Sequence, residues 1–271
     1  MPEAKPKLNV LDLFSGIPLG GVRLGLERTG GFETAAFCEI EDFPRRVLAK
    51  HWPEVPCYHD VTKLTGAILA SDGIAGIDVI TGGFPCQDLS TAGKQQGMGE
   101  GTRSGLWSEI VRLIGELSPS YVIVENVANL LSGPSDKRGG WFGRVLGDLA
   151  ECGYDAEWEN IPAAALGAPH RRERVWLVAY PQQKRRAGIL PSFPSECSAS
   201  IHGRNQAAIA LAASRSLDAV ARGDIHGESP FLDGHDGLSS VVGGRGAGGN
   251  AVVPQIPELI GNSILQAEAT A

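Results

Sequence analysis

The stretch that decides the fold is Leu8-Asn-Val-Leu-Asp-Leu-Phe-Ser-Gly16, an apolar run that ends in a serine and a glycine. A short apolar run closed by turn residues is typical of a strand in a sheet that is covered on both faces. A glycine after such a strand lets a ligand approach the backbone closely. By itself the turn is as compatible with a tight bend as with a nucleotide loop, because its spacing is not G-x-G-x-x-G.

Similar apolar runs recur through the first two thirds of the chain. We predict further strands at Ala35–Cys38, Ile77–Thr81, Tyr121–Glu125 and Arg174–Tyr180, in addition to Leu8–Phe14. Between two of them, apolar residues recur at helical spacing from Leu106 to Leu117, and Pro119 ends that helix. This alternation of strands and helices predicts an α/β fold with a doubly wound, mostly parallel sheet.

The composition changes after Tyr180. Residues 181–248 are rich in Gly, Ser and Pro and contain only two aromatic residues, Phe193 and Phe231. We expect a small, irregular region there, because so few large apolar side chains cannot form a substantial core. A helical pattern returns at Val252–Ile264. The expected organisation is therefore a main domain over residues 1–180, the irregular region over 181–248, and a helix within 249–271 that returns to the main domain.

The overall composition is that of a soluble globular protein, with 42% hydrophobic and 20% charged residues among 271. No apolar run approaches the roughly 20 residues that span a bilayer, and no charged-then-apolar leader opens the chain, so we expect no membrane partner and a cytoplasmic location. The five cysteines are scattered, without a C-x-x-C pair. We therefore expect neither a disulfide framework nor a bound metal.

The formal net charge of −7 conceals one basic stretch. Within it only Glu173 is acidic, and its basic residues are Arg171, Arg172, Arg174, Lys184, Arg185 and Arg186. Phosphate contacts are local, so a chain that is acidic overall can still bind nucleic acid through such a stretch. A solvated basic face is an equally good interpretation of the same residues.

Two acidic residues follow predicted strand ends. Glu39 comes directly after the second strand, where a carboxylate can accept hydrogen bonds from ribose hydroxyls. Asp60 follows the segment Val55–His59 and could bind an adenine amino group. Each acid alone would more often belong to a turn or a cap. Together with the turn that ends at Gly16, they indicate an adenosine pocket at the carboxyl ends of successive strands.

A second group of motifs carries the chemistry. Gly82-Gly-Phe-Pro-Cys86-Gln-Asp-Leu-Ser90 places a cysteine in a Gly/Pro loop directly after a strand, where exposure and backbone amides favour a reactive thiolate. Glu125-Asn126-Val127 ends a very apolar strand, in which a carboxylate is otherwise unfavourable. His170-Arg-Arg172-Glu-Arg174 supplies guanidinium groups for a phosphate or an acidic partner.

These motifs resemble those of the DNA cytosine-5 methyltransferase family. The resemblance rests on Phe14-Ser-Gly16, Pro85-Cys86-Gln87, Glu125-Asn126-Val127 and Arg172-x-Arg174, which occur in the family's order. Near the carboxyl end, Gly249-Asn250-Ala-Val-Val-Pro254 resembles the family's last motif, which completes the cofactor pocket. The resemblance covers residues 8–180 and 248–265.

The resemblance implies a Rossmann-like, S-adenosyl-L-methionine-dependent enzyme of bacterial or phage type, in which residues 1–180 are catalytic and 181–248 recognise the target. It implies that Cys86 adds to C6 of cytosine, that Glu125 binds the N3 edge, that Arg172 steadies the base or orients Glu125, and that Arg174 reaches a phosphate or an acidic partner. The implied cofactor-binding residues are Phe14, Ser15, Gly16, Glu39, Asp60, Pro85 and Asn250. The implied partner is duplex DNA with the target base flipped out, bound by a monomer, and a cognate restriction enzyme stays an open question.

The sequence departs from the family pattern at three points. Pro18 and Leu19 stand between Gly-Ile and Gly-Gly, His170 replaces a common Gln, and the stretch Arg-x-Leu-Thr-x-x-Glu is absent. Two alternatives keep the fold: a tRNA cytosine-5 methyltransferase and a non-catalytic DNA-binding relative. A dinucleotide oxidoreductase is disfavoured by the missing G-x-G-x-x-G.

Overall fold

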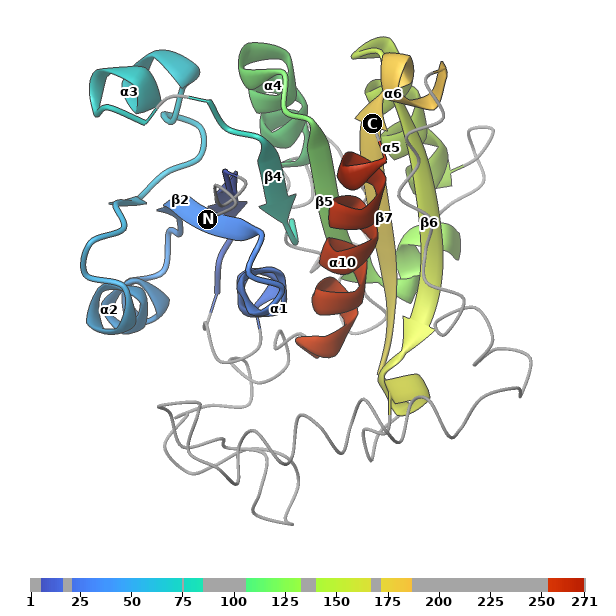
Figure 1. The fold of residues 1–271 in the computed structure, drawn as a ribbon, viewed down its shortest axis with the longest axis horizontal. Helices are drawn as coiled ribbons and strands as arrows, with labels where there is room; N and C mark the ends of the chain where they lie inside the picture. Colours follow the sequence, from blue (N-terminus) through green and yellow to red (C-terminus); the bar gives the residue numbers. More distant parts are fainter. Residues whose placement is uncertain are drawn as a thin grey trace.

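The computed structural model describes residues 6–16, 21–74, 76–84, 106–132, 140–166, 172–186 and 253–270. These residues form one seven-stranded sheet in the order β3-β2-β1-β4-β5-β7-β6, with helices on both of its faces (Figure 1). The strands are β1 (Leu8–Leu13), β2 (Phe32–Cys38), β3 (Cys57–Tyr58), β4 (Val79–Gly82), β5 (Tyr121–Val127), β6 (Tyr154–Pro162) and β7 (Glu173–Pro181).

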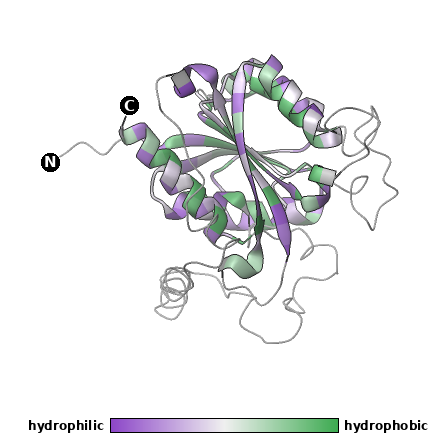
Figure 2. Ribbon diagram, turned by 90° about the vertical axis from the view of Figure 1, so that its right-hand side faces the viewer, coloured by the Kyte–Doolittle hydropathy of each residue, from purple (hydrophilic) through white to green (hydrophobic). Residues whose placement is uncertain are grey.

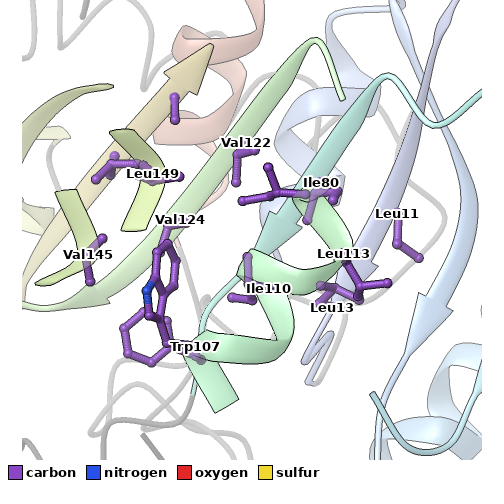
Figure 3. Packing of buried hydrophobic residues seen from close by; sticks show 14 of the residues in the cluster. Leu11, Leu13, Ile80, Trp107, Ile110, Leu113, Val122, Val124, Val145 and Leu149 are labelled. Atoms are coloured by element: carbon purple, nitrogen blue, oxygen red, sulfur yellow. The ribbon is translucent and has the colours of Figure 1, made fainter. Parts of the chain in front are cut away.

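Alternate residues of each strand enter two separate apolar layers. On one face, Leu11, Ile80 and Val124 pack against α4 (Trp107–Leu117) and α5 (Gly140–Glu151). Figure 3 shows this packing, with Trp107 and Ile110 of α4 beside the strand residues. On the other face, strand residues pack against α1 (Val22–Arg28) and α10 (Gln255–Ala269). The covering helices carry apolar residues on one side and polar residues on the other (Figure 2), as expected for amphipathic helices on a sheet. The other described helices are α2 (Asp42–His51), α3 (Gly66–Ser71) and α6 (Gln182–Arg186), with 3-10 turns η3 (Ala128–Ser132) and η4 (Ala163–Leu166).

The direction of the strands confirms the predicted mostly parallel α/β sheet. Strands β3, β2, β1, β4 and β5 pair in parallel, whereas β7 runs antiparallel to both β5 and β6. The antiparallel strand therefore begins at the edge where the parallel strands end. Residues from the start of β7 can reach the loops that follow the parallel strands.

The predicted elements within the described residues are confirmed, with differences at their ends. β2 begins at Phe32, three residues before the predicted start, and the C-terminal helix begins at Gln255 and not at Val252. The sequence did not predict strands β3 and β6 or helices α1, α2, α3, α5 and α6. β6 is an edge strand whose polar residues hide its alternation. Most of the expected recognition region, residues 187–248, lies outside the described residues, so the division into three parts stays a prediction. None of the described helices is long and apolar enough to cross a membrane.

Helix α10 lies directly against α1 because Gly25 has no side chain. A Cβ atom at Gly25 would lie 2.2 Å from the carbonyl oxygen of Pro254 and 2.6 Å from Cγ of Pro257. Both contacts involve groups with little freedom to move, since one is backbone and the other a proline ring. The close approach places the start of α10, and with it Pro254, directly against α1.

We expect Gly25→Ala to destabilise the protein by about 1–3 kcal/mol, because the added methyl group must displace α10 from α1. Gly115→Ala is the matched control, since a Cβ there meets no atom within 4 Å. The control should be neutral or stabilising by about 0.5–1 kcal/mol, as for any exposed helical glycine. Chemical denaturation measures both, and equal stabilities for the two variants would contradict the packing argument.

Candidate functional site

Three of the predicted cofactor groups lie at one edge of the sheet. Phe14–Gly16 follow β1, Glu39 follows β2 and Asp60 follows β3. The three strands are in parallel register, with Leu13 beside Cys38 and Cys38 beside Tyr58. The carboxyl ends of these strands are therefore adjacent, as the sequence predicted. The roles of the three groups in binding stay predictions.

The Glu39 carboxylate is fixed between two backbone amides. Its Oε2 accepts a hydrogen bond of 2.8 Å from the Gly16 amide, and its Oε1 accepts one of 2.8 Å from the Glu41 amide. The residue is only 6% exposed. Gly16 has a φ of 58°, a conformation that favours glycine. The turn after β1 is thus tied to the end of β2, and each carboxylate oxygen can still accept a second hydrogen bond.

Asp60 shapes the turn that follows β3. Its Oδ1 accepts hydrogen bonds from the Thr62 amide at 3.0 Å and the Thr62 hydroxyl at 2.7 Å. These hydrogen bonds lower the pKa of Asp60, which therefore stays ionised. Asp60 therefore stabilises a turn, as its residue type suggests, and it also lies at the edge where the adenosine pocket is predicted.

Asp12 lies beneath this edge and was not predicted as a site residue. It is 5% exposed, and its Oδ1 accepts a hydrogen bond of 2.5 Å from the Thr81 hydroxyl. Burial raises the pKa of Asp12 to about 6, although the Thr81 hydrogen bond and the positive charge of Arg23 act in the opposite direction. The Ser15 hydroxyl donates to the Asp12 carbonyl oxygen at 2.8 Å. The sequence signal that could have identified Asp12 is a carboxyl near the end of a mostly apolar strand.

Glu125 and Arg174 form the second part of the site. Arg174 Nε lies 2.8 Å from Glu125 Oε1, and the two side chains are only 21% and 12% exposed. Burial raises the pKa of Glu125, while the positive charges of Arg174 and Arg172 oppose the rise. The antiparallel register places Glu125 opposite Trp176, two residues from Arg174 on the same face of β7. The structure therefore brings Glu125, Arg172 and Arg174 together, and their catalytic roles stay predictions.

The three charged residues line an open, shallow recess. Its remaining walls come from the end of β6, from η4, from the first half of β7 and from the start of α10 with the residues before it, and consist of Ile161, Ala163, Trp176, Val253 and Ile256. The recess thus combines one carboxyl and two guanidinium groups with a mostly apolar lining.

The chain that leads to Cys86 passes close to Glu125. A Cβ atom at Gly83 would lie 3.2 Å from Glu125 Oε2. The Asn126 amide donates a hydrogen bond of 3.2 Å to the Phe84 carbonyl oxygen. Asn126 is only 3% exposed, and the sequence motif alone did not indicate this contact. Pro85 and Cys86 themselves, like Asn250, lie outside the described residues.

The described residues of the basic stretch do not form one surface, so the interpretation as a single solvated basic face is wrong for them, whereas nucleic-acid binding through part of the stretch stays a prediction. Arg172 and Arg174 lie near Glu125 at the start of β7, whereas Lys184 pairs with Glu268 and Arg185 with Asp155 beyond its far end. A strand of nine residues is about 30 Å long. Residues close in sequence are thus separated by the whole height of the sheet.

Within the described residues, no group of three or more His, Cys, Asp or Glu side chains could hold a metal ion. The absence of a metal therefore stays a prediction for the whole chain.

The model of the C-5 cytosine-specific DNA methylase family matches residues 8–216. The chain belongs to this family. It is 37% identical over 202 residues to the Type II methyltransferase M.Sau3AI of Staphylococcus aureus, covering 69% of this chain and 47% of that protein. It is 35% identical over 176 residues to M2.BsuMI of Bacillus subtilis, covering 64% and 42%.

A solved structure of a DNA modification methyltransferase encoded within a prophage in E. coli has a similar fold. Its TM-score is 0.54 at 28% identity, over 66% of this chain and 48% of that one. The present member of the methylase family thus spans about half the length of the relatives it matches. The match includes β1, β5 and β7, which carry the residues described above.

The raised pKa of Asp12 predicts a loss of stability as the pH rises from about 4 to about 6. The folded protein binds a proton in this range that the unfolded chain, with a pKa of 3.8, releases. The contribution is present in full below pH 3.8 and is lost above about 6, by about 3 kcal/mol at most.

Asp12→Asn should remove this pH dependence while keeping a partner for Thr81. The measurement is urea denaturation of both proteins at several pH values, and their difference in free energy of unfolding is the quantity to follow. A difference that stays constant from pH 4 to pH 7 would show that folding does not raise the pKa of Asp12.

Proposed function

We propose that this chain transfers a methyl group from S-adenosyl-L-methionine to C5 of cytosine in duplex DNA, with Cys86 as nucleophile. The observation that carries the proposal is the largely buried Glu125, whose pKa is raised and which lies against both Arg174 and Gly83. A carboxyl that holds its proton to a higher pH than in water suits the protonation of a ring nitrogen. Membership of the cytosine-specific family supports the same base.

The residues at the ends of β1, β2 and β3 fit an adenosine-containing cofactor. The fixed Glu39 carboxylate can accept hydrogen bonds from ribose hydroxyls, and the adjacent Ile40, which is 58% exposed, offers an apolar surface to a purine ring. We propose that the cofactor is held by Phe14, Ser15, Gly16, Glu39, Asp60, Pro85 and Asn250. When bound, S-adenosyl-L-methionine supplies an electrophilic methyl group on a sulfonium sulfur.

Cytosine C5 is a poor nucleophile until the ring is activated. The Cys86 thiolate forms a bond to C6, Glu125 gives a proton to N3, and the displaced electron pair makes C5 nucleophilic. Once C5 has accepted the methyl group, with the sulfonium leaving as a neutral thioether, the C5 proton passes to a base and the N3 proton returns to Glu125. The bond between the Cys86 sulfur and C6 then breaks, which restores the aromatic ring and the thiolate. Covalent catalysis thus divides one difficult step into two easier ones.

The two arginines have different places in this scheme. Arg174, at 2.8 Å from Glu125, holds the carboxyl in position and compensates its charge once the proton has left. Arg172 lines the same recess and can steady the anionic base. Because C5 and C6 lie within the base stack of duplex DNA, the target cytosine must be flipped out to reach these groups.

The biological role, the location, the oligomeric state and the recognition region are further proposals. The relatives are named Type II methyltransferases, so we propose a role in restriction-modification in the cytoplasm of a bacterial host. We expect a monomer that contacts its recognition sequence through residues 181–248, since the catalytic part offers only the flipped-base recess and phosphate contacts.

The function is tested by incubating the protein with S-adenosyl-L-methionine labelled in its methyl group and either duplex DNA or tRNA. Digestion to nucleosides should yield labelled 5-methyldeoxycytidine from DNA. Label in 5-methylcytidine from tRNA would move the activity to RNA. Absence of labelled product despite binding to DNA would favour a non-catalytic relative.

Cys86→Ser should abolish turnover and leave cofactor binding nearly intact, because the thiol acts on the base and not on the sulfonium. Duplex DNA with 5-fluorocytosine at the target should form an adduct with the wild type that resists denaturation, since fluorine cannot leave C5 as a proton does. Cys152→Ser is the matched control, at a half-buried cysteine after α5. Equal labelling by wild type and Cys86→Ser would remove Cys86 from the mechanism.

Glu125→Gln should reduce the chemical step by about 10²–10⁴-fold and affect DNA binding much less, since Gln can bind the base edge but delivers no proton. Single-turnover rates and DNA affinity measure the two effects. In the wild type the rate should fall as the pH rises through the raised pKa of Glu125.

Glu33→Gln serves as control, at a carboxylate that is 66% exposed on β2. A Glu125→Gln rate within threefold of wild type would be incompatible with a proton-donating role.

A further inference from the structure

One arginine from α4 reaches the turn that follows Asp60. Arg112 Nη2 donates hydrogen bonds to the carbonyl oxygens of Val61 at 2.9 Å and Leu64 at 2.8 Å. Both carbonyls belong to residues whose side chains are buried. The guanidinium group therefore joins the helix to the backbone of the turn and not merely to its surface.

Arg112 is itself held by two carboxylates on its own helix. Its Nε lies 2.9 Å from Glu109 Oε2 and its Nη1 lies 2.6 Å from Glu116 Oε1. Glu116 in addition accepts a hydrogen bond of 2.8 Å from the Gly66 amide through Oε2. A Cβ atom at Gly66 would lie 3.2 Å from Leu117 Cδ2, so the backbone approaches α4 closely there. Polar contacts from α4 thus reach the backbone between Val61 and Gly66 at three points.

The turn has internal hydrogen bonds as well, but these have a different effect. The Asp60 carbonyl oxygen accepts from the amides of Lys63 and Leu64, which determines the local shape of the turn. Such bonds move with the turn and do not determine where it stands relative to the sheet. The contacts from α4 do, because α4 is packed against the sheet through Ile110, Leu113 and Ile114.

We propose that Arg112 is a positioning residue for cofactor binding, which holds the turn from Asp60 to Gly66 in place at the edge of the sheet. The inference rests on the proposed function, since it takes Asp60 as part of the cofactor pocket. Arg112 does not need to touch the cofactor. Without it, two partly buried carbonyl oxygens lose their donor, and binding must order a turn that is otherwise already in place.

Arg112→Gln should therefore raise the Kd and the KM for S-adenosyl-L-methionine about tenfold, which corresponds to about 1.4 kcal/mol. The value of kcat at saturating cofactor should stay within about twofold, because Arg112 contacts none of the groups that act on the base. Arg112→Lys should restore part of the affinity, since its single nitrogen keeps the charge but cannot serve both carbonyls and both carboxylates. This separation of KM from kcat distinguishes positioning from general loss of stability.

The experiment uses the full chain, with isothermal titration calorimetry of S-adenosyl-L-methionine and steady-state methylation of duplex DNA. Arg144→Gln is the matched control, because Arg144 pairs with Asp148 one turn along α5 and belongs to a different helix. Its Kd should equal that of the wild type. If Arg112→Gln fails to fold by circular dichroism, Arg112→Lys replaces it, with an expected rise in Kd of about threefold.

An unchanged Kd in the folded Arg112 variant, or a fall in kcat with unchanged KM, would overturn the positioning role. A wild-type chain that does not bind S-adenosyl-L-methionine would instead overturn the proposed function. The positioning role is therefore tested by the Arg112 variants, and the proposed function by the wild-type chain.

Discussion

The ion pair between Glu125 and Arg174 is the interaction on which the candidate site depends. A carboxylate at the end of a very apolar strand loses hydration, and it is tolerated only with a partner. That partner comes from β7, the one strand of the described sheet whose direction is opposite to that of all the others. If β7 were parallel to β5, its arginines would lie at the opposite edge. Strand direction is thus a condition for the charge pair and for the recess around it.

The edge at the ends of β1, β2 and β3, where we propose that the cofactor binds, is organised by a different principle. Here each acidic side chain is held by the backbone or by a neighbouring hydroxyl group before any ligand arrives: Glu39 by two amides, Asp60 by Thr62, and Asp12 by Thr81. Such preorganisation reduces the conformational entropy that binding must otherwise remove. Arg112 of α4 has a similar effect, because it donates hydrogen bonds to the backbone of the turn after Asp60. The two halves of the site meet at β4 and β5, whose ends carry Gly83 and Glu125 next to one another.

Much of this arrangement could be predicted from local patterns. The apolar runs at Leu8–Phe14 and Tyr121–Glu125 are buried strands, because continuous apolar sequence is stable only in a sheet covered on both faces. Tyr154–Pro162 was missed, since an edge strand exposes polar residues and loses its alternation. The basic stretch was misjudged as one surface for a related reason. Proximity in sequence says nothing about proximity in space when an extended strand lies between the residues.

The sequence by itself determined five of the seven described strands, the acids and glycines at their ends, and the family to which these motifs belong. Each of these follows from local chemistry, because periodicity and turn residues act over a few positions. Only the tertiary structure decided that Arg174 meets Glu125, that Arg112 holds the turn after Asp60, and that Gly25 admits α10 against α1. These contacts join residues far apart in the chain, and they depend on strand order, strand direction and side-chain packing, which no local pattern specifies.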